Sequence, residues 1–517
     1  MNSFRLIAIY SLILLGAVFC KPISERKQPP PTLEQLASED LNLNGEQLAN
    51  AYCATCHLKP EPQILDKSTW KDKVLPDMRK RMGLYLEEDF GTIMPIDMDV
   101  PKGIYSDIPF INKDNWEKLK TYYLDNAPDI PNPQADKASI NLGVPGFEIV
   151  RPKFTNFYPD LVTLLRVEPS SGKLWLGHRF KSIFVLDPSR NFQILDSIAT
   201  DTAPIDIHWD KSSNSFELLT MGVMDPSNDS SGVVNEFYKS GQDWKSKPVL
   251  ENLKRPVNLE YADFNGDGIL DKVVCEFGNH VGELSLYLSN GDHWEKQVLK
   301  NSPGARRVVI EDLDDDGDLD ILVLMTQANE GFFAFLNQGE GEFREKILLR
   351  FHPAFGSSDF QFLDVNQDGL KDLILVNGDN ADLSQVLKSF HGVRIFLNQG
   401  DLDFEPSWFY PMHGASGLEI DDFDQDGDQD FFVLSFFPDQ NQSPKQNLLY
   451  FQQNEKMDFQ AYSPVIEEDS HWLTMTKGDL DADGDLDLVV GVFEFDDLYK
   501  QPQEAWSPIV VFKNQKK

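Results

Sequence analysis

The chain has 517 residues, more than one ordinary hydrophobic core serves, and this length predicts several domains or a repeat array. Its 84 acidic residues outnumber its 47 basic residues, and the formal net charge is -37 at pH 7. A surface of this sign repels phosphates and anionic lipid headgroups, so nucleic acid is excluded as a partner. Only four cysteines are present, too few for a disulfide framework in a chain of this size.

Residues 1–20 have the pattern of an export signal peptide. The short basic segment MNSFR precedes the apolar run LIAIYSLILLGAVF, which is too short to span a bilayer and ends at Cys20. The pattern predicts an exported protein of the bacterial periplasm, the membrane surface or the cell surface. Cys20 resembles the lipidated cysteine of bacterial lipoproteins, although Phe19 replaces the small residue usual before it. A membrane tether through lipidated Cys20 and a plain cleaved signal therefore both stay open.

A Pro-rich tether, residues 21–40, leads into a region with helical periodicity, residues 41–127. Aromatic and apolar residues recur at helical spacing near both of its ends: Leu48, Tyr52, Trp116, Leu119 and Tyr123. A second Pro-rich segment, residues 128–146, follows as a linker. We therefore expect a small all-α domain between two extended segments.

A cysteine pair with an adjacent histidine lies near the start of this domain, in the sequence AYCATCHLKP. Cys53, Cys56 and His57 have the C-x-x-C-H spacing that attaches one haem c through two thioether bonds, with the histidine as an iron ligand. A thioredoxin-like dithiol would need a βαβ setting, and a zinc site would need a second pair of ligands; neither accompanies the motif. The motif therefore predicts one covalent haem c.

Residues 41–127 resemble a bacterial class I cytochrome c domain, with a helix before C-x-x-C-H, a methionine loop and a final amphipathic helix. The resemblance implies a methionine as the sixth iron ligand, and Met94 in GTIMPIDM has the matching context. Met98 and Met78 are the alternatives, and Met82 is expected in the core. A His/Met pair would close the iron to other ligands, which favours electron transfer over catalysis.

The rest of the chain, residues 147–517, alternates short apolar runs with Gly, Asn and Asp turns, as all-β folds do. Five stretches share one acidic pattern: DFNGDGILD from Asp263, DLDDDGDLD from Asp312, DVNQDGLKD from Asp364, DFDQDGDQD from Asp422 and DLDADGDLD from Asp479. Their starts are 49, 52, 58 and 57 residues apart, which is typical of one supersecondary unit per repeat. Strand-like runs follow each stretch, so every repeat predicts about four short strands.

Two further repeats have lost most of the aspartates. One begins at Asp206, and the other is RVEPSSGKLWLG with Gly172 at its turn. Seven repeats of four strands predict a seven-bladed β-propeller, whose circular closure protects the sheet edges. The terminal run IVVFKN is expected to pair near residues 147–154 and close the ring. The predicted fold class is thus multidomain, with a small all-α domain followed by an all-β propeller.

The acidic stretches follow D-x-[DN]-x-D-G-x-x-D, in which oxygens at positions one, three, five and nine converge on one ion and glycine permits the turn. Hard oxygen ligands in a flexible loop suit Ca²⁺. An EF-hand would need a glutamate at position twelve, where these stretches have Val or Leu. The stretches resemble the calcium-binding FG-GAP and VCBS repeats of integrin-type propellers, although the Phe-Gly and Gly-Ala-Pro signatures are not evident.

The resemblance implies about five structural calcium ions and none in the two eroded repeats. The implied ligands are Asp263, Asn265, Asp267 and Asp271; Asp312, Asp314, Asp316 and Asp320; Asp364, Asn366, Asp368 and Asp372; Asp422, Asp424, Asp426 and Asp430; and Asp479, Asp481, Asp483 and Asp487. Cys275, in the apolar run KVVCEF, is expected to be a buried and inert thiol.

A second candidate site lies just ahead of the acidic stretches, on segments expected to cross one propeller face. Its members are Arg255, Arg306, His352, His413 and His471. Similar offsets in neighbouring blades would bring them together, where they suit an anionic substrate, an organic cofactor or the carboxylates of a partner. Polar residues are also common in propeller loops without any such role.

The combined pattern is similar to bacterial proteins that fuse a cytochrome c domain to a propeller of such repeats. It implies an exported electron-transfer protein that passes electrons to redox partners, with the calcium-stabilised propeller as docking domain, and not primarily an enzyme. The alternatives are a haem-coupled oxidoreductase of the sugar or alcohol dehydrogenase kind, with the propeller as catalytic domain, and a propeller-based adhesion protein. No catalytic residue and no oligomeric state are predicted.

Overall fold

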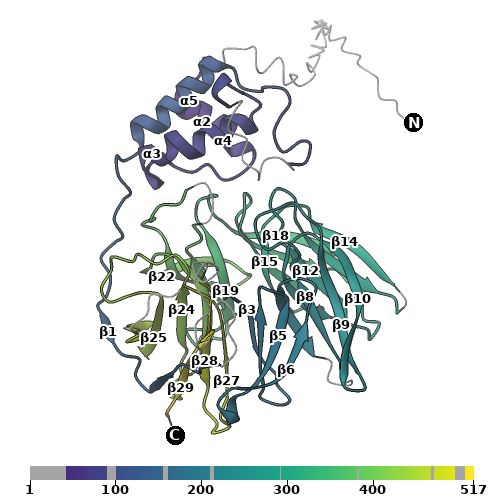
Figure 1. Ribbon diagram of the computed structural model, residues 1–517. Helices are drawn as coiled ribbons and strands as arrows, with labels where there is room; N and C mark the ends of the chain where they lie inside the picture. Colours follow the sequence, from purple (N-terminus) through teal and green to yellow (C-terminus); the bar gives the residue numbers. More distant parts are fainter. Residues whose placement is uncertain are drawn as a thin grey trace, which may run out of the picture.

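The computed structural model describes residues 42–89, 100–154, 161–209, 215–291, 293–380, 384–466, 471–494 and 507–516. A group of helices between Gly45 and Asn126 lies over one end of a large ring of β-sheets, to which a long connecting segment joins it (Figure 1). Met94, Met98 and the export signal with Cys20 lie outside the described residues.

The helical part contains the elements that the sequence pattern predicts on either side of the cysteine motif. They are α2 (Gly45–Tyr52), α3 (Lys67–Thr69), α4 (Leu75–Arg81) and α5 (Lys113–Asn126), with short 3-10 segments at Cys53–Thr55, Pro62–Ile64 and Glu87–Asp89 and a π-helical turn at Trp70–Val74. The side chain of Asn44 accepts from Gln47 N and that of Gln47 from Asn44 N, so a capping box starts α2. At the start of α5, Asn112 accepts from Asn115 N.

Helices α2 and α5 pack closely because α2 begins with a glycine. A Cβ atom at Gly45 would lie 2.4 Å from Lys118 O and 2.6 Å from Tyr122 Cβ, both on α5. The apolar residues expected at helical spacing, including Leu48 and Trp116, are buried together in one core. The sequence prediction of a small all-α unit is therefore met by its helices, whereas its relation to cytochrome c stays a prediction.

The β part is a seven-bladed propeller, as predicted. Blade 1 contains β3 (Val162–Val167), β4 (Leu174–His178), β5 (Ser182–Asp187) and β6 (Gln193–Ala199). Blade 2 contains β7 (Pro204–Trp209), β8 (Ser215–Thr220), β9 (Gly232–Ser240) and β10 (Asp243–Leu253). Blade 3 contains β11 (Pro256–Ala262), β12 (Asp271–Glu276), β13 (Glu283–Ser289) and β14 (Trp294–Lys300). Blade 4 contains β15 (Ala305–Glu311), β16 (Asp320–Met325), β17 (Gly331–Asn337) and β18 (Phe343–Arg350).

The remaining three blades follow the same antiparallel order. Blade 5 contains β19 (Ser357–Leu363), β20 (Asp372–Asn377), β21 (Gly392–Asn398) and β22 (Phe404–Pro411). Blade 6 contains β23 (Ala415–Asp421), β24 (Asp430–Ser435), β25 (Leu448–Glu455) and β26 (Asp458–Ser463). Blade 7 contains β27 (Trp472–Gly478), β28 (Asp487–Val492) and β29 (Ile509–Asn514), completed by β2 (Phe147–Val150).

The ring closes through the two ends of the propeller sequence. Strand β2 pairs antiparallel with β29, with Phe147 opposite Asn514 and Val150 opposite Val511, as the run IVVFKN predicts. The predicted linker is not only a connection. Three of its residues, Ile140–Leu142, form strand β1, which pairs in parallel with β26. This fifth strand covers the outer edge of blade 6, a protection that β-sheet edges need.

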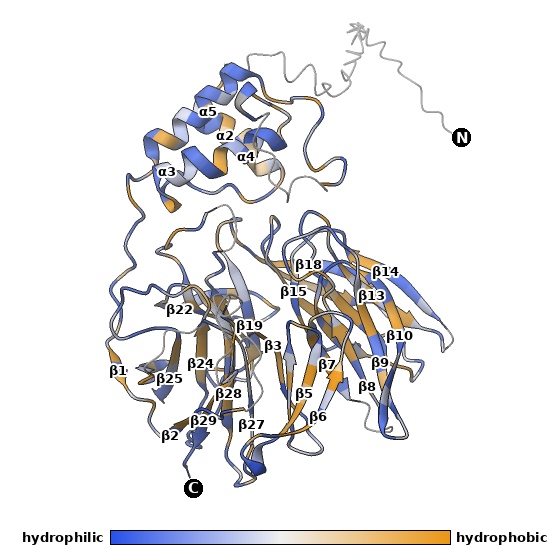
Figure 2. Cartoon of the chain, in the orientation of Figure 1, coloured by the Kyte–Doolittle hydropathy of each residue, from blue (hydrophilic) through white to orange (hydrophobic). Residues whose placement is uncertain are grey.

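The apolar runs that follow the acidic stretches become fully buried second strands. Every residue of β12, β16, β20, β24 and β28 is buried, and hydrophobic colour concentrates along the inner strands of the blades (Figure 2). Cys275 on β12 has no exposed surface, and burial raises the pKa of its thiol well above the usual value. This is the inert cysteine that the sequence predicts.

Seven charged side chains, one from the first strand of each blade, interact where these strands meet around the inside of the ring. They are Arg166, Asp206, Glu260, Arg307, Asp359, Glu419 and Lys477. Arg166 lies 3.1 Å from Asp206 and Arg307 lies 2.7 Å from Asp359, so these ion pairs join neighbouring blades. Burial raises the pKa of Glu260 to about 7, and the nearby Asp206 carboxylate acts in the same direction.

We expect Glu260→Gln to flatten the pH dependence of propeller stability. The pKa of Glu260 is about 7 in the folded chain and 4.5 when unperturbed, so the folded state retains a proton that the unfolded state loses. The contribution of protonated Glu260 to the free energy of unfolding is therefore fully present below pH 4.5 and is lost as the pH rises to about 7. This contribution is on the order of 1–3 kcal/mol. Urea unfolding from pH 4 to pH 8 measures the slope, and the exposed Glu295→Gln should retain it. Identical slopes for wild type and Glu260→Gln would contradict this assignment.

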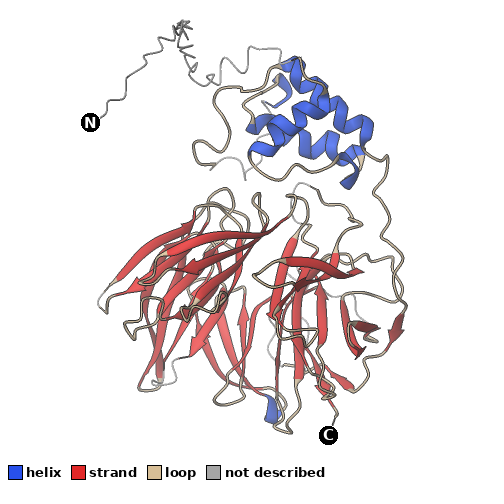
Figure 3. Cartoon of the chain, turned by 180° about the vertical axis from the view of Figure 1, so that it is seen from behind, coloured by secondary structure: helices blue, strands red, loops and turns tan. Residues whose placement is uncertain are grey.

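The helical part and the acidic stretches lie at opposite faces of the propeller. Ala354, just before β19, packs against the helical core together with Val386. Strand β19 runs away from this end, so the acidic stretch that follows it lies at the far end of the blade. Figure 3, a view from behind, shows the helical part at one end of the strands. Within the described ranges, no helix combines the length and apolar character needed to cross a bilayer.

Candidate functional site: five acidic loops and a cysteine–histidine motif

The five acidic stretches, called acidic loops 1 to 5 below, have the same backbone. They are residues 263–271, 312–320, 364–372, 422–430 and 479–487. Each joins the first and second strands of its blade, so β-strands flank it and the EF-hand alternative fails. The fourth and sixth residues have positive φ in every loop; in acidic loop 2 these are Asp315 at 59° and Gly317 at 94°. A Cβ at Gly317 would meet no atom within 4 Å, so the backbone angle, not space, calls for glycine.

The first aspartate of each loop holds this turn. In acidic loop 2, Asp312 accepts hydrogen bonds from Asp316 N at 3.1 Å and from Gly317 N at 2.9 Å. The same pair of bonds recurs at the other four first positions, Asp263, Asp364, Asp422 and Asp479. The backbone thus fixes where one carboxylate lies in each loop.

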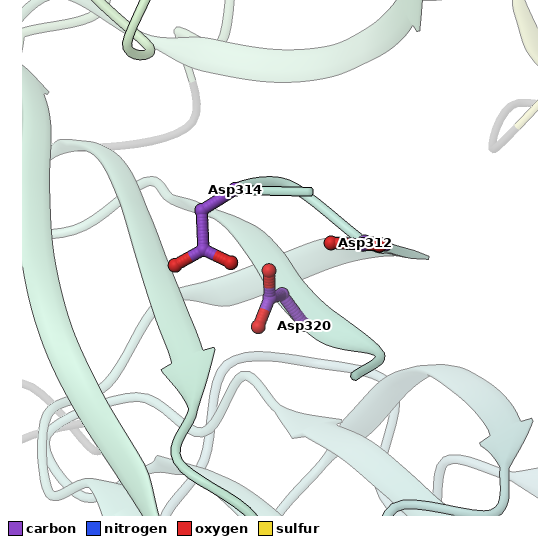
Figure 4. Close-up of side chains that lie close together, drawn as sticks. All are labelled: Asp312, Asp314 and Asp320. Carbon is purple, nitrogen blue, oxygen red and sulfur yellow. The ribbon is translucent and has the colours of Figure 1, made fainter. Parts of the chain in front are cut away.

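Three carboxylates converge in three of the loops. Asp312, Asp314 and Asp320 each place one oxygen within 4.8 Å of the others, and Figure 4 shows their carboxylates facing a common space. In acidic loops 4 and 5 the converging groups are positions one, three and five: Asp422, Asp424 and Asp426, and Asp479, Asp481 and Asp483. Acidic loops 1 and 3 have Asn265 and Asn366 at position three, where an amide oxygen replaces the carboxylate.

The ninth aspartate has a second role that the sequence pattern does not indicate. Asp320 is fully buried, and its oxygens accept from Leu313 N at 2.8 Å and Asn337 N at 2.7 Å. It therefore fastens its loop to the third strand of the blade. Equivalent bonds are made by Asp271, Asp372 and Asp487, while Asp430 accepts from Tyr450 Oη and Gln453 N. A carboxylate has about four acceptor sites, so these bonds leave room for an ion.

Three aspartates at position seven, Asp318, Asp428 and Asp485, were not among the predicted ligands, and two of them have buried oxygens without hydrogen-bond partners among the described residues. Asp485 is 2 % exposed, and both of its carboxylate oxygens are buried without a hydrogen-bond partner among the described residues. One oxygen of Asp428 is in the same situation. Burial and the neighbouring carboxylates Asp483 and Asp426 raise the pKa of each to about 6. The extra aspartate after glycine, in DGDLD and DGDQD, was the available sequence signal.

Several buried carboxylate oxygens without hydrogen-bond partners lie together in acidic loops 4 and 5, and such a group of oxygens fits a hard divalent cation. Position-three oxygens of Asp424 and Asp481 are also buried without a hydrogen-bond partner in the part of the chain described. Burial raises the pKa of Asp430 to about 7 and that of Asp487 to about 6. A bound cation would replace this mutual repulsion by attraction, and an all-oxygen set with a flexible turn is what Ca²⁺ prefers. The donor set of the acidic loops therefore fits calcium.

The cysteine–histidine motif follows the end of α2. Cys53 is half-buried beside Tyr123 of α5, with 3.9 Å between Tyr123 Oη and Cys53 Sγ, whereas Cys56 is exposed. Burial raises the pKa of the Cys53 thiol. Both cysteines are free thiols, so no disulfide competes with attachment of a group. The chain after the motif is tied to the helical core, since Tyr123 Oη donates to Pro60 O at 2.9 Å.

His57 is oriented by its own backbone. Its Nδ1 lies 3.0 Å from Leu58 O, which favours the tautomer that leaves Nε2 free to bind a metal. Burial lowers the pKa of His57, and Arg81 and Arg350 lower it further, so the ring is held neutral. Two thiols and a neutral imidazole in this arrangement fit haem c. Met82 is buried in the helical core and Met78 packs against it, as expected of packing residues.

The propeller-face candidates do not form one site. Arg255 donates to Met224 O and Arg306 to Ser358 O, so both guanidinium groups bind backbone carbonyls of their surroundings. His471 lies 3.0 Å from Glu494. Burial lowers the pKa of Arg255, and Arg306 lies close enough for its charge to lower that pKa further. His352 and His413 are linked separately, through a third histidine, His391, which interacts with both.

The cluster of His352, His391 and His413, with Lys388 and Arg394, is therefore smaller than the predicted site and different in content. His391 lies between β20 and β21, outside the segments that precede the acidic loops, so the repeat offset did not find it. Burial lowers the pKa of all three histidines, and that of His352 falls to about 4.

Four overlapping stretches of the chain match the FG-GAP-like repeat family: residues 263–323, 312–375, 364–433 and 422–490. Each match runs from one acidic loop into the next, so this part of the chain consists of FG-GAP-like repeats. No curated protein matches the sequence.

Solved structures with a similar chain trace share little sequence with this one. One is a chain from the Saccharomyces cerevisiae complex of dbp5 with nup159, gle1, IP6 and ADP, at 9% identity and a TM-score of 0.43, over 72% of this chain and 98% of that one. Another is the β-propeller domain of Myceliophteria thermophila Cps50 (Swd1), at 9% identity and a TM-score of 0.41, over 70% and 99%.

Proposed function

We propose that the chain is a c-type cytochrome that transfers electrons. Its seven-bladed propeller with FG-GAP-like repeats is a type of domain suited to recognition and docking. The helical part carries one haem c, and the propeller, held by about five calcium ions, is the surface on which a redox partner docks. Export through residues 1–20, with or without a lipid tether at Cys20, belongs to this proposal because covalent haem c is attached outside the bacterial cytoplasm.

One observation carries the proposal. His57 presents a neutral imidazole whose Nδ1 is engaged by Leu58 O, while Cys53 and Cys56 remain free thiols on the turn just before it. Bound haem would supply a one-electron iron couple. The chain's own groups would do the rest: two thiols anchor the porphyrin, His57 ligates iron through Nε2, and Tyr123 and Trp70 hold the following loop through Pro60 O and Pro62 O.

The calcium ions have a mechanical role in this proposal. Side chains link neighbouring acidic loops, because Gln367 Nε2 donates to Gly427 O at 2.9 Å and Gln425 Nε2 to Gly484 O at 3.5 Å. Ions in the loops would stiffen one whole face of the ring. The oxidoreductase alternative loses support, since Arg255 and Arg306 are committed to backbone carbonyls.

Replacing Cys53 and Cys56 by alanine tests the proposal. Expressed with the cytochrome c maturation machinery, wild type should carry one covalent haem, detected by in-gel haem staining and by intact mass. The double variant should carry none, whereas the propeller should remain folded, because the motif lies outside it. Cys275→Ala is the control and should keep its haem. A wild type that leaves the maturation host without covalent haem would refute the proposed function.

A further inference from the structure

The propeller reaches the cysteine–histidine motif with a short segment that connects blades 4 and 5. Ala354 of this segment, together with Val386 of the β20–β21 connection, packs against the core of the helical part. A second contact lies farther along the same face, where the rings of Tyr105 and His280 are 6.2 Å apart. The two parts of the chain therefore share an interface.

The linker between the helical part and the propeller, residues 128–146, makes hydrogen bonds to both. Gln134 Nε2 donates to His391 O at 3.2 Å, and Lys137 Nζ donates to Pro411 O at 2.8 Å. Asn132 Nδ2 donates to Gln63 O at 2.8 Å on the helical side. Contacts at both ends of the linker orient the helical part on the propeller.

Two propeller side chains at this interface lie near His57. Arg350, the last residue of β18, is close enough to lower the pKa of His57, and His352, two residues later, is close enough to be affected by His57 in turn. Ala354, two residues after His352, packs against the helical core that also contains Cys53, so these side chains reach the motif across about 300 residues of sequence. The side of the helical part that carries the motif therefore faces the propeller.

His352 has the properties of a metal-binding imidazole. Its ring packs edge-on against Phe355 and Phe390, with ring centroids 5.6 and 5.0 Å apart. Its Nδ1 is buried and accepts or donates no hydrogen bond among the described residues. Burial, with Lys388 and Arg394 nearby, lowers the pKa of His352 to about 4, so the ring is neutral at physiological pH. A buried nitrogen without a partner costs free energy unless a group absent from the polypeptide binds it.

Arg350 has a matching feature. Its Nη2 donates to Asn329 Oδ1 at 3.1 Å, but its Nε is buried without a hydrogen-bond partner in the described chain. Haem carries two propionates, which a guanidinium group binds well. An imidazole nitrogen and a guanidinium nitrogen without hydrogen-bond partners in the described chain thus lie two residues apart on the propeller side of the interface.

We propose that the haem site is shared between the two domains, with His352 of the propeller as the second axial iron ligand and Arg350 beside the porphyrin edge. This inference rests on the proposed haem at His57. It replaces the expectation that Met94 is the sixth ligand, and it makes the propeller part of the redox centre as well as a docking surface. Ligation by two histidines should give a lower reduction potential than a His/Met pair, because methionine ligation raises the potential of c-type haem.

The first test needs no variant. Full-length protein carrying covalent haem is studied in the ferric state by electron paramagnetic resonance and by near-infrared spectroscopy, which distinguish two imidazoles from imidazole plus thioether. We expect the bis-histidine signature and no methionine-to-iron band. A methionine-to-iron band in wild type would overturn the inference while leaving the proposed function intact, whereas absence of covalent haem would refute the proposed function itself.

The second test uses His352→Gly, with His413→Gly as the matched control from the same histidine cluster. His352→Gly should retain covalent haem but change from low-spin to high-spin, bind carbon monoxide when reduced, and regain the low-spin spectrum on addition of free imidazole. His413→Gly should keep the wild-type spectrum, since His413 lies one blade farther along. A His352→Gly spectrum identical to wild type would overturn the inference, and loss of the low-spin spectrum in Met94→Ala would then identify the methionine as the ligand.

Discussion

Removal of calcium with EGTA is expected to lower the melting temperature of the propeller by about 10–15 °C. Each bound ion stabilises the folded state by about 2.7 kcal/mol at a free concentration one hundred times its dissociation constant. Five sites act on one ring, because side-chain bonds such as Gln367 Nε2 to Gly427 O connect adjacent loops. Differential scanning calorimetry with and without EGTA measures the shift, and excess Ca²⁺ should reverse it.

The stoichiometry gives an independent check. Metal analysis of dialysed wild type should find about five calcium ions per chain. The double variant Asp312→Asn/Asp314→Asn removes two of the three converging carboxylates of acidic loop 2 and should lose one ion. Asp243→Asn, at an exposed position on β10, is the control and should lose none. An unchanged melting temperature in EGTA would contradict a structural role for calcium.

Truncation of a buried ninth-position aspartate is expected to destabilise the propeller more than truncation of any exposed loop carboxylate. Asp320→Ala leaves the amides of Leu313 and Asn337 without their acceptor at a fully buried site. Two unsatisfied buried donors cost about 3–5 kcal/mol together. Urea unfolding at constant pH measures the loss, and Asp320→Asn, which keeps one acceptor oxygen, should be intermediate.

Measuring the stability loss of Asp320→Ala with and without EGTA distinguishes the contribution of the hydrogen bonds from that of the bound ion. The Asp320→Ala loss should persist in EGTA, because the amides of Leu313 and Asn337 lose their acceptor whether or not calcium is bound. The exposed Asp243→Ala on β10, outside the acidic loops, is the control and should change stability by less than about 1 kcal/mol. If EGTA abolished the difference between wild type and Asp320→Ala, the aspartate would act through the ion alone.

The repeat architecture was predictable because its signals are local and periodic. Five copies of one turn sequence at intervals of about one blade, each followed by an apolar run, indicate both the loop and the buried strand behind it. The C-x-x-C-H motif and the flanking helices are equally local. Even ring closure followed from the pattern, since an apolar terminal run needs a partner strand.

Features that depend on chain segments meeting in space were missed or misjudged. Strand β1 occupies three residues of an expected linker and pairs only because the edge of blade 6 is there. The predicted propeller-face residues do not form one site, for a similar reason. Arg255 and Arg306 bind backbone carbonyls of distant segments, and the spacing of residues along the sequence does not reveal these partners. His391, on a connection of different length, joined His352 and His413 instead.

The amino-acid sequence by itself determined the number of blades, the position of the acidic loops and the cysteine–histidine motif, because turn chemistry and strand periodicity are properties of short segments. Only the tertiary structure decided that the ninth aspartates fasten loops to third strands, that charges of neighbouring blades pair at the inner strands, and that the segment containing His352 lies beside the helical part. Those relations depend on the ring's closure and on the docking of the helices, through which residues hundreds of positions apart become neighbours.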